Sequence, residues 1–226
     1  MARRAGVTVQ ERIVELIHDR ELPPGAPMPT EPQLMDLLGA SRNSVREAIR
    51  ALQALGIVEI RHGYGTFVGR ASIDVLTPSL TFRVRSGGGI RALHDLVEVR
   101  ELLETGLIGD VVGTVSDARF AALDALVSAM AHDAGADRAF HALLYEGCGN
   151  ELVLQLIALF WDVYHEVDGQ LAPPAGRSAQ VIANHRRIVD ALRARDRGAA
   201  REAMRLHFHD VKQRIMQAEA GVAAAG

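Results

Sequence analysis

The order of apolar and polar residues predicts a helix at the start of the chain. Residues 7–25 read VTVQERIVELIHDRELPPG, in which apolar positions recur every three or four residues until two prolines and a glycine follow. Such spacing places the apolar side chains on one face of a helix, and the prolines end it. The predicted buried face comprises Val9, Ile13, Leu16 and Ile17.

Two shorter helices and a hairpin are predicted next. Thr30 and Gln33 have the spacing of a capping box, and the helix that they begin ends at Gly39. Ser41 is a suitable N-cap for a second helix. Its apolar stripe comprises Val45, Ala48, Ile49, Leu52 and Leu55. Two short β-branched runs flank a glycine-containing loop in residues 56–69, which predicts a β-hairpin. This order of elements is the winged form of the helix-turn-helix.

The remainder of the chain has the pattern of a helical bundle. A softer stretch with LTPSL and RSGGGI follows the hairpin, so we place the domain boundary near residue 70. Residues 1–70 are expected to form the winged domain, 71–90 a linker or connecting helix, and 91–226 an all-helical domain. Helix breaks are predicted at Gly113–Ser116, Gly135, Gly147–Asn150, residues 172–178 and Asp196–Gly198. They divide that domain into roughly six helices, and the predicted fold class is mainly α.

Composition and charge narrow the class of protein. With 226 residues and 48% hydrophobic content, the chain can form two modest domains, and only 4% aromatic residues favour packed helices over a β-sandwich. A formal net charge of −3 means that any nucleic-acid-binding surface has to be local. The single cysteine, Cys148, excludes an internal disulfide and fits a reducing compartment. Since no apolar run can span a membrane and MARRAG does not begin a signal peptide, we expect no membrane partner and a cytoplasmic location.

A basic face is predicted on the second helix of the winged motif, away from its apolar stripe. It comprises Arg42, Asn43, Arg46 and Arg50. Arginine can bind guanine O6 and N7 through two hydrogen bonds or grip a phosphate, and the helix N-terminus at Ser41 adds backbone donors. The hairpin tip adds Arg61, His62, Gly63 and Tyr64 as contacts to the DNA backbone or minor groove. Isolated arginines are usually only solvated, but this clustering with a turn and a wing favours DNA binding.

Polar residues also interrupt the apolar pattern of the helical domain. Asp137 and His141 in DRAFH are one helical turn apart, and His185 and His207 lie in two later helices. If these helices are neighbours, three imidazoles and a carboxylate can converge on a metal ion, although spacing alone leaves this open against ordinary surface or core positions. The other histidines singled out are assigned to such ordinary positions: His18, His94, His132, His165 and His209.

The N-terminal motif resembles a known family. The segment MPTEPQLMDLLGASRNSVREAIRALQALGIVEIRHGYGTFV is similar to the winged helix-turn-helix of the GntR family of bacterial transcriptional regulators. The resemblance implies that Arg42 and Arg46 read the operator and that His62 and Gly63 are wing contacts. The family usually has a DNA-contacting arginine directly after the glutamate of the second helix, where this chain has Pro32. A first helical turn tolerates proline, so we expect the fold to survive and one contact to be lost.

The segments LVEVRELLE and DRAFHALLYEGCGN, with His185 and His207, resemble the FCD domain, the helical effector domain of the FadR subfamily of GntR regulators. The resemblance implies a divalent metal ion, and Zn²⁺ or Ni²⁺ suits the ligand set. The implied ligands are Asp137, His141, His185 and His207. Arg100 is expected to bind the carboxylate of a small organic acid, with an ion pair to Glu104 as the alternative. Asn150 is expected to cap the following helix rather than to contact an effector.

These features predict a ligand-responsive regulator, expected to be a repressor, that binds double-stranded operator DNA as a homodimer. Half-sites one DNA turn apart require recognition helices about 34 Å apart. An effector that prefers one arrangement of the dimer shifts its population toward or away from that spacing. A direct metal sensor is one alternative. A metalloenzyme is another, but the chain has no HExxH and no nucleophile motif, so we expect no enzyme.

Overall fold

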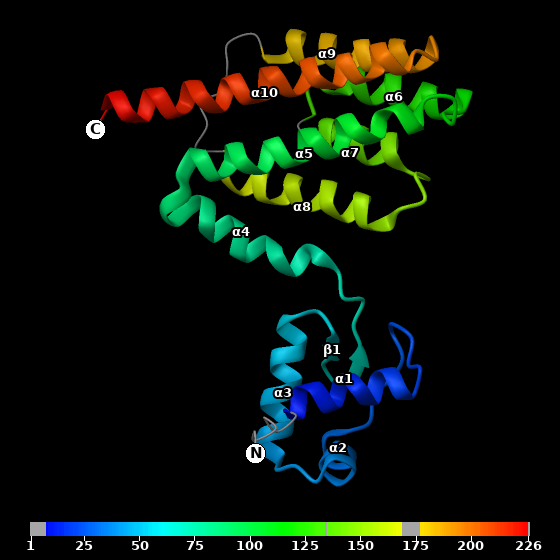
Figure 1. Ribbon diagram of the computed structural model, residues 1–226, viewed down its shortest axis with the longest axis vertical. Helices are drawn as coiled ribbons and strands as arrows, with labels where there is room; N and C mark the ends of the chain where they lie inside the picture. The colour runs from blue at the N-terminus through cyan, green and yellow to red at the C-terminus, as the bar shows by residue number, and fades with distance from the viewer. Residues whose placement is uncertain (1–7, 134, 169–176, 226) are drawn as a thin grey trace, which may run out of the picture. The chain divides into compact units, whose positions relative to one another are not determined.

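The computed structural model describes residues 8–133, 135–168 and 177–225, which belong to two compact units (Figure 1). The first unit ends at Val75 and the second begins at Leu76. The MARRAG segment and most of the break predicted at residues 172–178 lie outside the described residues. Among the residues described, no helix is long and apolar enough to cross a lipid bilayer.

The first unit has the predicted order of elements. They are α1 (Val9–Asp19), α2 (Glu31–Leu38), α3 (Arg42–Ala54), β1 (Val58–Arg61) and β2 (Gly65–Val68). The two strands pair antiparallel, with Val58 opposite Val68, and an isolated bridge from Pro27 to Phe67 joins the segment before α2 to the hairpin. The unit is therefore a winged helix-turn-helix, which confirms the predicted fold.

Local capping explains where α2 and α3 begin and end. The backbone N–H of Thr30 donates to Gln33 Oε1 at 2.8 Å, as a capping box requires. Gly39 ends α2 in the left-handed conformation with φ of +56°, which a residue with a side chain adopts at a cost. Ser41 then accepts a hydrogen bond from the Ser44 N–H at 3.2 Å and begins α3. The tight turn between the helices thus follows from a few residues.

A small apolar core holds the first unit together. The buried residues are Ile13, Met28, Leu34, Leu38, Val45, Ala48, Ile49, Leu52, Val58 and Val68. The predicted stripe of α3 is confirmed at four of its five positions. Leu55 is the exception, because α3 ends at Ala54 and the Leu55 side chain is 57% exposed. The apolar pattern extends one residue further than the helix that carries it.

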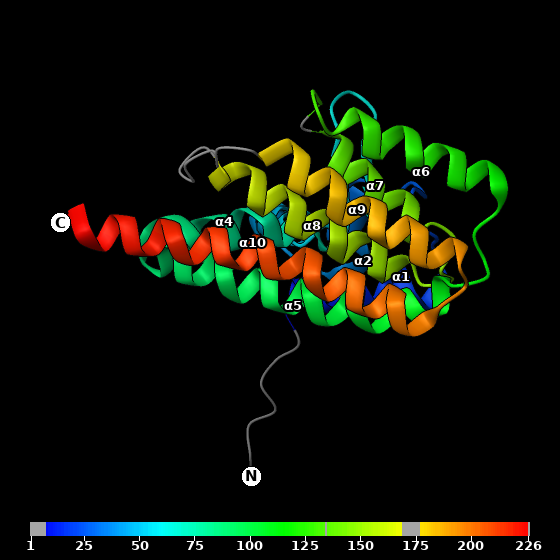
Figure 2. The same cartoon turned by 90° about the horizontal axis from the view of Figure 1, so that it is seen from above.

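The second unit is a helical bundle preceded by short helical turns. Its elements are η1 (Ile73–Leu76, at the boundary), α4 (Thr77–Arg83), η2 (Val84–Gly88), α5 (Gly89–Val111), α6 (Asp117–Ala129), α7 (Gly135–Tyr145), α8 (Glu151–Asp168), α9 (Arg177–Arg193) and α10 (Arg197–Ala225). Figures 1 and 2 show α10 running lengthwise along α5 and α9, while α7 packs against α6 and α8. The stretch predicted as a linker or connecting helix contains η1, α4 and η2, and α4 packs against α8. Helices that are far apart in the sequence, such as α5 and α10, therefore lie side by side.

Candidate DNA-binding surface and candidate metal centre

The outer face of α3 presents every basic residue that the sequence singled out on that helix. Arg42, Asn43, Arg46 and Arg50 are all exposed. Two of them make surface ion pairs: Arg46 Nε lies 3.9 Å from Glu31 Oε1, and Arg50 Nη1 donates to Glu47 at 3.0 Å. Exposed pairs of this kind contribute little, so a phosphate or a base edge can replace them. The face has the exposure that DNA contact requires, and its residue assignments stay predictions.

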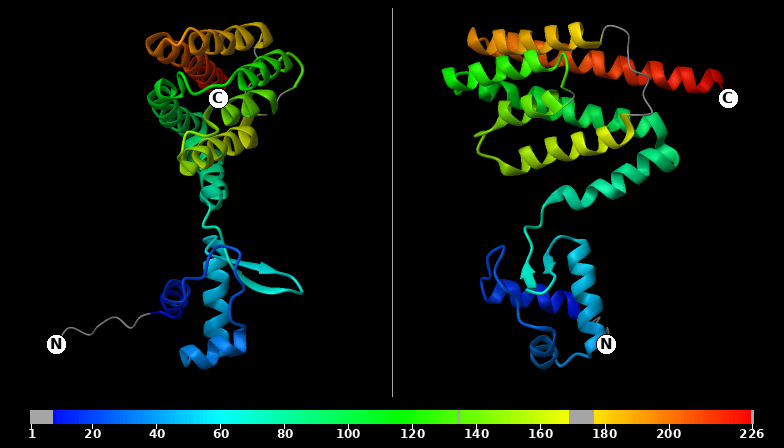
Figure 3. Two further views of the ribbon diagram at one scale, coloured as in Figure 1. Left: turned by 90° about the vertical axis from the view of Figure 1, so that its right-hand side faces the viewer. Right: turned by 180° about the vertical axis from the view of Figure 1, so that it is seen from behind.

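The hairpin tip extends away from α3, as the left view of Figure 3 shows. Gly63 has φ of +80°, and the neighbouring Tyr64 is 84% exposed. Arg61, in contrast, is held along its strand: it donates two hydrogen bonds of 3.0 Å to Glu59, and its guanidinium lies 4.3 Å from the centre of the Phe67 ring. These hydrogen bonds lower the pKa of the Glu59 carboxyl. The tip is left to His62, Gly63 and Tyr64 as free surface.

Pro32 occupies the first turn of α2, directly after Glu31. The first amides of a helix have no partner within the helix, so the missing N–H of a proline costs nothing there. The expected survival of the fold is thus confirmed. The chemistry at this position is nevertheless different, because a pyrrolidine ring has no donor for a phosphate.

The four predicted metal ligands lie together in the second unit. Asp137 and His141 come from α7, His185 from α9 and His207 from α10, and one donor atom of each lies within 4.8 Å of the others. His141 and His185 are fully buried and His207 is 5% exposed, while the Asp137 side chain is 27% exposed. Three imidazoles and one carboxylate from three helices form a compact cluster of possible metal ligands, at the positions that the resemblance to the FCD domain implies.

Hydrogen bonds outside the cluster orient two of its imidazoles. His185 Nδ1 lies 2.8 Å from the Val181 carbonyl oxygen, and His141 Nδ1 lies 2.5 Å from Glu104 Oε2. Both Nδ1 atoms carry a proton and donate it in these contacts, so both Nε2 atoms face the cluster, where a metal ion can take the place of any proton that they carry. His185 Nε2 is 3.0 Å from Asp137 Oδ1. His141 Nε2 is 3.4 Å from the same oxygen and has no hydrogen-bond partner within the described part of the chain.

The charges of the cluster favour a bound cation. Burial raises the pKa of Asp137, but His185 and His141 outweigh it and hold that pKa well below its usual range. Burial, followed by the nearby His185 and His141, lowers the pKa of His207 well below its usual range, so this imidazole is neutral at pH 7. Burial lowers the pKa of His141, but the Glu104 carboxylate reverses this and the pKa is raised. An ionised carboxylate, a neutral imidazole and a buried nitrogen without a partner fit a divalent ion.

Arg100 makes the ion pair that the sequence offered as the alternative to effector binding. Its side chain is buried on α5, and Nε donates to Glu104 Oε1 at 2.5 Å. The guanidinium lies 4.5 Å from the centre of the Trp161 ring and 5.3 Å from that of Phe208. One of its terminal nitrogens, Nη2, is buried with no hydrogen-bond partner among the described residues. The ion pair therefore leaves Nη2 of Arg100 available to donate a hydrogen bond to a bound effector.

The sequence did not identify Glu104 as a hydrogen-bond partner of the cluster. Glu104 is fully buried and contacts His141, whereas the sequence predicted only an ion pair between Glu104 and Arg100. The sequence feature that points to Glu104 is its spacing of four residues from Arg100, which places both side chains on one face of α5. Its contact with α7 spans 37 residues of sequence, which no local pattern reveals.

The other histidines and Asn150 have ordinary structural positions. His18, His132, His165 and His209 are exposed, as expected. His94 lies near Asp95 and Glu98 on an exposed face of α5, where Asp95 is already 3.9 Å from Arg83, and we do not assign a metal there. Asn150 accepts a hydrogen bond from the Leu152 N–H at 3.1 Å, which confirms its capping role at the start of α8.

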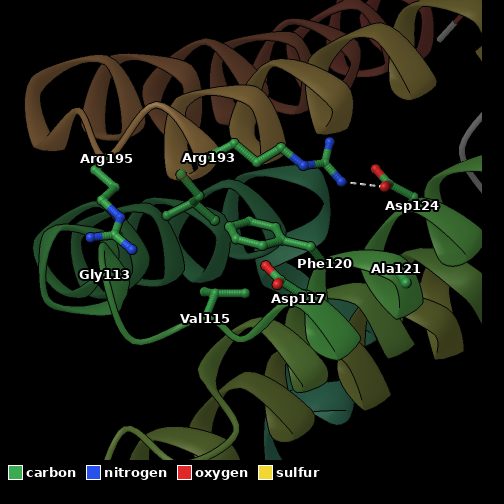
Figure 4. Close-up of a pocket in the computed structure, with 9 residues that line it drawn as sticks. Gly113, Val115, Asp117, Phe120, Ala121, Asp124, Arg193 and Arg195 are labelled. Atoms are coloured by element: carbon green, nitrogen blue, oxygen red, sulfur yellow. Dashed lines mark hydrogen bonds and ion pairs between the residues drawn. The ribbon is translucent and has the colours of Figure 1, made fainter.

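A separate surface pocket of about 480 Å³ lies between the end of α5, α6 and the end of α9 (Figure 4). Asp124 within it is paired with Arg193, and Asp117 and Phe120 face the same space (Figure 4). None of the predicted ligand or DNA-contacting residues lines this pocket. Its charges are mixed and largely exposed, so we assign no ligand to it.

A winged helix-turn-helix with an exposed basic helix face, joined in one chain to a helical unit, defines a DNA-binding transcriptional regulator. The model of bacterial regulatory proteins of the GntR family matches residues 6–68, and the FCD domain model matches residues 95–210. The chain belongs to the GntR family and carries an FCD domain.

Individual relatives agree with this assignment. The transcriptional repressor NanR of Cronobacter sakazakii is 30% identical, with 90% of this chain and 82% of the relative covered. The Glc operon transcriptional activator of Escherichia coli is 31% identical, with 93% of this chain and 89% of the relative covered. An Escherichia coli protein named for regulation of an L-lactate dehydrogenase operon is 30% identical, with 92% of this chain and 85% of the relative covered.

Among solved structures, a GntR protein of Streptococcus agalactiae is 28% identical, with a TM-score of 0.63 and 91% of this chain and 97% of that chain covered. The curated relatives are named as transcriptional regulators, which agrees with the expectation of a regulator and not an enzyme.

Proposed function

We propose that this GntR-family regulator is a homodimeric repressor whose operator affinity is set by a small organic acid bound at a metal centre. The observation that carries the proposal is the convergence of four donors from α7, α9 and α10, with His141 Nε2 buried and without a hydrogen-bond partner in the described residues. The ligands are Asp137, His141, His185 and His207. Zn²⁺ or Ni²⁺ suits three imidazoles and one carboxylate.

The donor cluster has the dimensions that a first-row ion needs. Its possible ligand atoms lie within 4.8 Å of one another, and ligands at about 2.0–2.1 Å from a tetrahedral ion are about 3.3–3.4 Å apart, so the side chains would move inward on binding. A bound ion would satisfy the lone pair of His141 Nε2 and offset the charge of Asp137. When bound, it would supply a positive charge and open positions for an anionic oxygen.

Arg100 supports an acid as the effector. Its guanidinium is buried against Trp161 and Phe208, and Nη2 has no partner within the described residues, so a carboxylate would satisfy it. Glu104 already neutralises much of the charge, so a monocarboxylate fits better than a more highly charged acid. The name of one relative refers to L-lactate dehydrogenase, and L-lactate is a small hydroxy acid of this kind.

The DNA-binding half of the proposal rests on the exposed face of α3 and the wing tip. Arg42, Asn43, Arg46 and Arg50 would contact one operator half-site, with His62 and Gly63 at the adjacent backbone or minor groove. One relative is named a repressor and another an activator, so repression by this chain is itself part of the proposal. The effector acts only through its difference in affinity for the two arrangements of the dimer.

Metal content of purified variants tests the proposal. After chelation and reloading with Zn²⁺, the wild type should hold a stoichiometric amount by elemental analysis, and His185→Ala should hold clearly less. His209→Ala is the matched control, because His209 is on the same helix as His207 but exposed. Equal metal in wild type and His185→Ala would overturn the centre.

Operator binding then separates an acid effector from the direct metal sensor. The zinc-loaded protein is titrated with operator DNA in the presence of L-lactate, with lactamide as the uncharged control. Release by L-lactate alone supports an acid effector. Operator affinity that follows free zinc without any acid would make the ion itself the signal.

A further inference from the structure

Glu104 is a buried carboxylate whose two oxygens serve two different groups. It lies near the middle of α5 with no exposed surface. Its Oε1 accepts from Arg100 Nε at 2.5 Å, and its Oε2 lies 2.5 Å from His141 Nδ1. Burial of a carboxylate is costly unless charged or polar partners surround it. Here the partners are an arginine and an imidazole of the donor cluster itself.

The contact with Glu104 determines what His141 can offer to the cluster. Because Oε2 accepts a hydrogen bond from Nδ1–H, the other nitrogen, Nε2, faces the other ligands and can offer its lone pair to an ion. His185 uses a backbone carbonyl, that of Val181, for the same purpose. Both a carbonyl and a carboxylate fix the orientation of the ring. The charge of a carboxylate also makes the imidazole a stronger metal ligand.

We infer that Glu104 is a positioning residue of the metal centre, holding His141 with Nε2 toward the ion and increasing its strength as a ligand. The inference rests on the metal centre proposed above. Glu104 does not bind the ion itself, because both of its oxygens are engaged by Arg100 and His141. It also joins the arginine expected to bind the effector to one of the metal ligands through a single side chain.

The variant Glu104→Gln tests this role in the full-length protein. Arg100 and His141 use different oxygens of Glu104, and glutamine replaces one of these oxygens with an NH2 group that can only donate, so one of the two contacts is lost. Zinc affinity, measured by competition with a chromophoric chelator, should fall by about 10–100-fold, the usual effect of losing such a partner. Tyr145→Phe is the matched control: it removes the 3.0 Å hydrogen bond from Tyr145 to the backbone carbonyl of Glu104 and leaves the carboxylate in place. Its zinc affinity should equal that of the wild type.

A second readout separates positioning from general loosening of the fold. In zinc-loaded wild type, the Nδ1 proton of His141 should give a slowly exchanging, strongly downfield NMR signal, because it is buried against a carboxylate. In Glu104→Gln this signal should move upfield or disappear, and in Tyr145→Phe it should remain. If the glutamine variant does not fold, Glu104→Asp replaces it, since the shorter carboxylate cannot span Arg100 and His141 and should also weaken zinc binding.

Glu104→Gln or Glu104→Asp with wild-type zinc affinity and an unchanged His141 signal would overturn the inference. That result differs from a failure of the metal centre. If the centre is wrong, the wild type itself takes up no stoichiometric zinc and the ligand variants change nothing.

Discussion

The arginines of α3 and the polar cluster of the second unit have opposite relations to solvent. Arg46 and Arg50 lie on the surface, and their ion pairs with Glu31 and Glu47 are exposed. Arg100 and Glu104 are buried, and their pair belongs to a network with His141. Exposed charges cost little to keep free for DNA, whereas buried charges must have partners in every state of the protein. Arginine is thus available for binding in the first unit, whereas in the second unit Arg100 is needed for stability.

The largest effect should follow from removing the charge of Arg100. Arg100→Met keeps much of the side-chain volume but leaves Glu104 with only His141 as a charged partner, so the free energy of unfolding should fall by about 3–5 kcal/mol. Arg50→Met, which breaks an exposed pair, should leave it unchanged. Denaturant unfolding of the metal-free proteins measures both, and equal losses would remove the distinction between the two regions.

Arg46→Ala should act on DNA binding and not on stability. Loss of a bidentate base or phosphate contact should weaken operator binding by about 1–3 kcal/mol, measured by fluorescence anisotropy at fixed salt. Arg205→Ala provides the control, because Arg205 is an exposed arginine of α10 in the second unit. Unchanged operator binding by Arg46→Ala would refute its assignment.

The buried cluster should also make stability depend on pH in the metal-free protein. The pKa of folded His207 is lowered, so the unfolded chain binds a proton first, and the stability present above about pH 6.5 is lost as the pH falls below it. The slope attributable to this residue can reach about 1.4 kcal/mol per pH unit. In His207→Gln this part of the slope should be absent below about pH 6.5. An identical pH profile for the variant would contradict the neutral state of His207.

The smallest effect is expected at Pro32. Pro32→Arg restores the arginine typical of the family in the first turn of α2, and operator binding should tighten by about 0.5–1.5 kcal/mol. The slope of log affinity against log salt should steepen by about 0.9, as one further phosphate contact requires. An unchanged slope would mean that this position of α2 does not reach DNA in this protein.

Local patterns sufficed for much of the fold. Gln33, Gly39 and Ser41 predicted the ends of α2 and α3 because capping depends on neighbouring residues. The resemblance to a known domain, together with helical spacing, predicted which four donors converge. Sequence patterns missed Glu104, because its burial depends on how α5 meets α7. They also could not show that Glu59 holds Arg61 back from the wing tip.

The donors of the cluster are far apart along the chain, from Asp137 to His207, and come from three separate helices. An ion held by them would act as a reversible cross-link that closes a long loop, in the manner of a disulfide, and restricts the unfolded chain. Binding to the folded form alone would also favour folding by mass action. Metal supply would then govern how long each copy of the regulator survives proteolysis, independently of whether an operator is occupied.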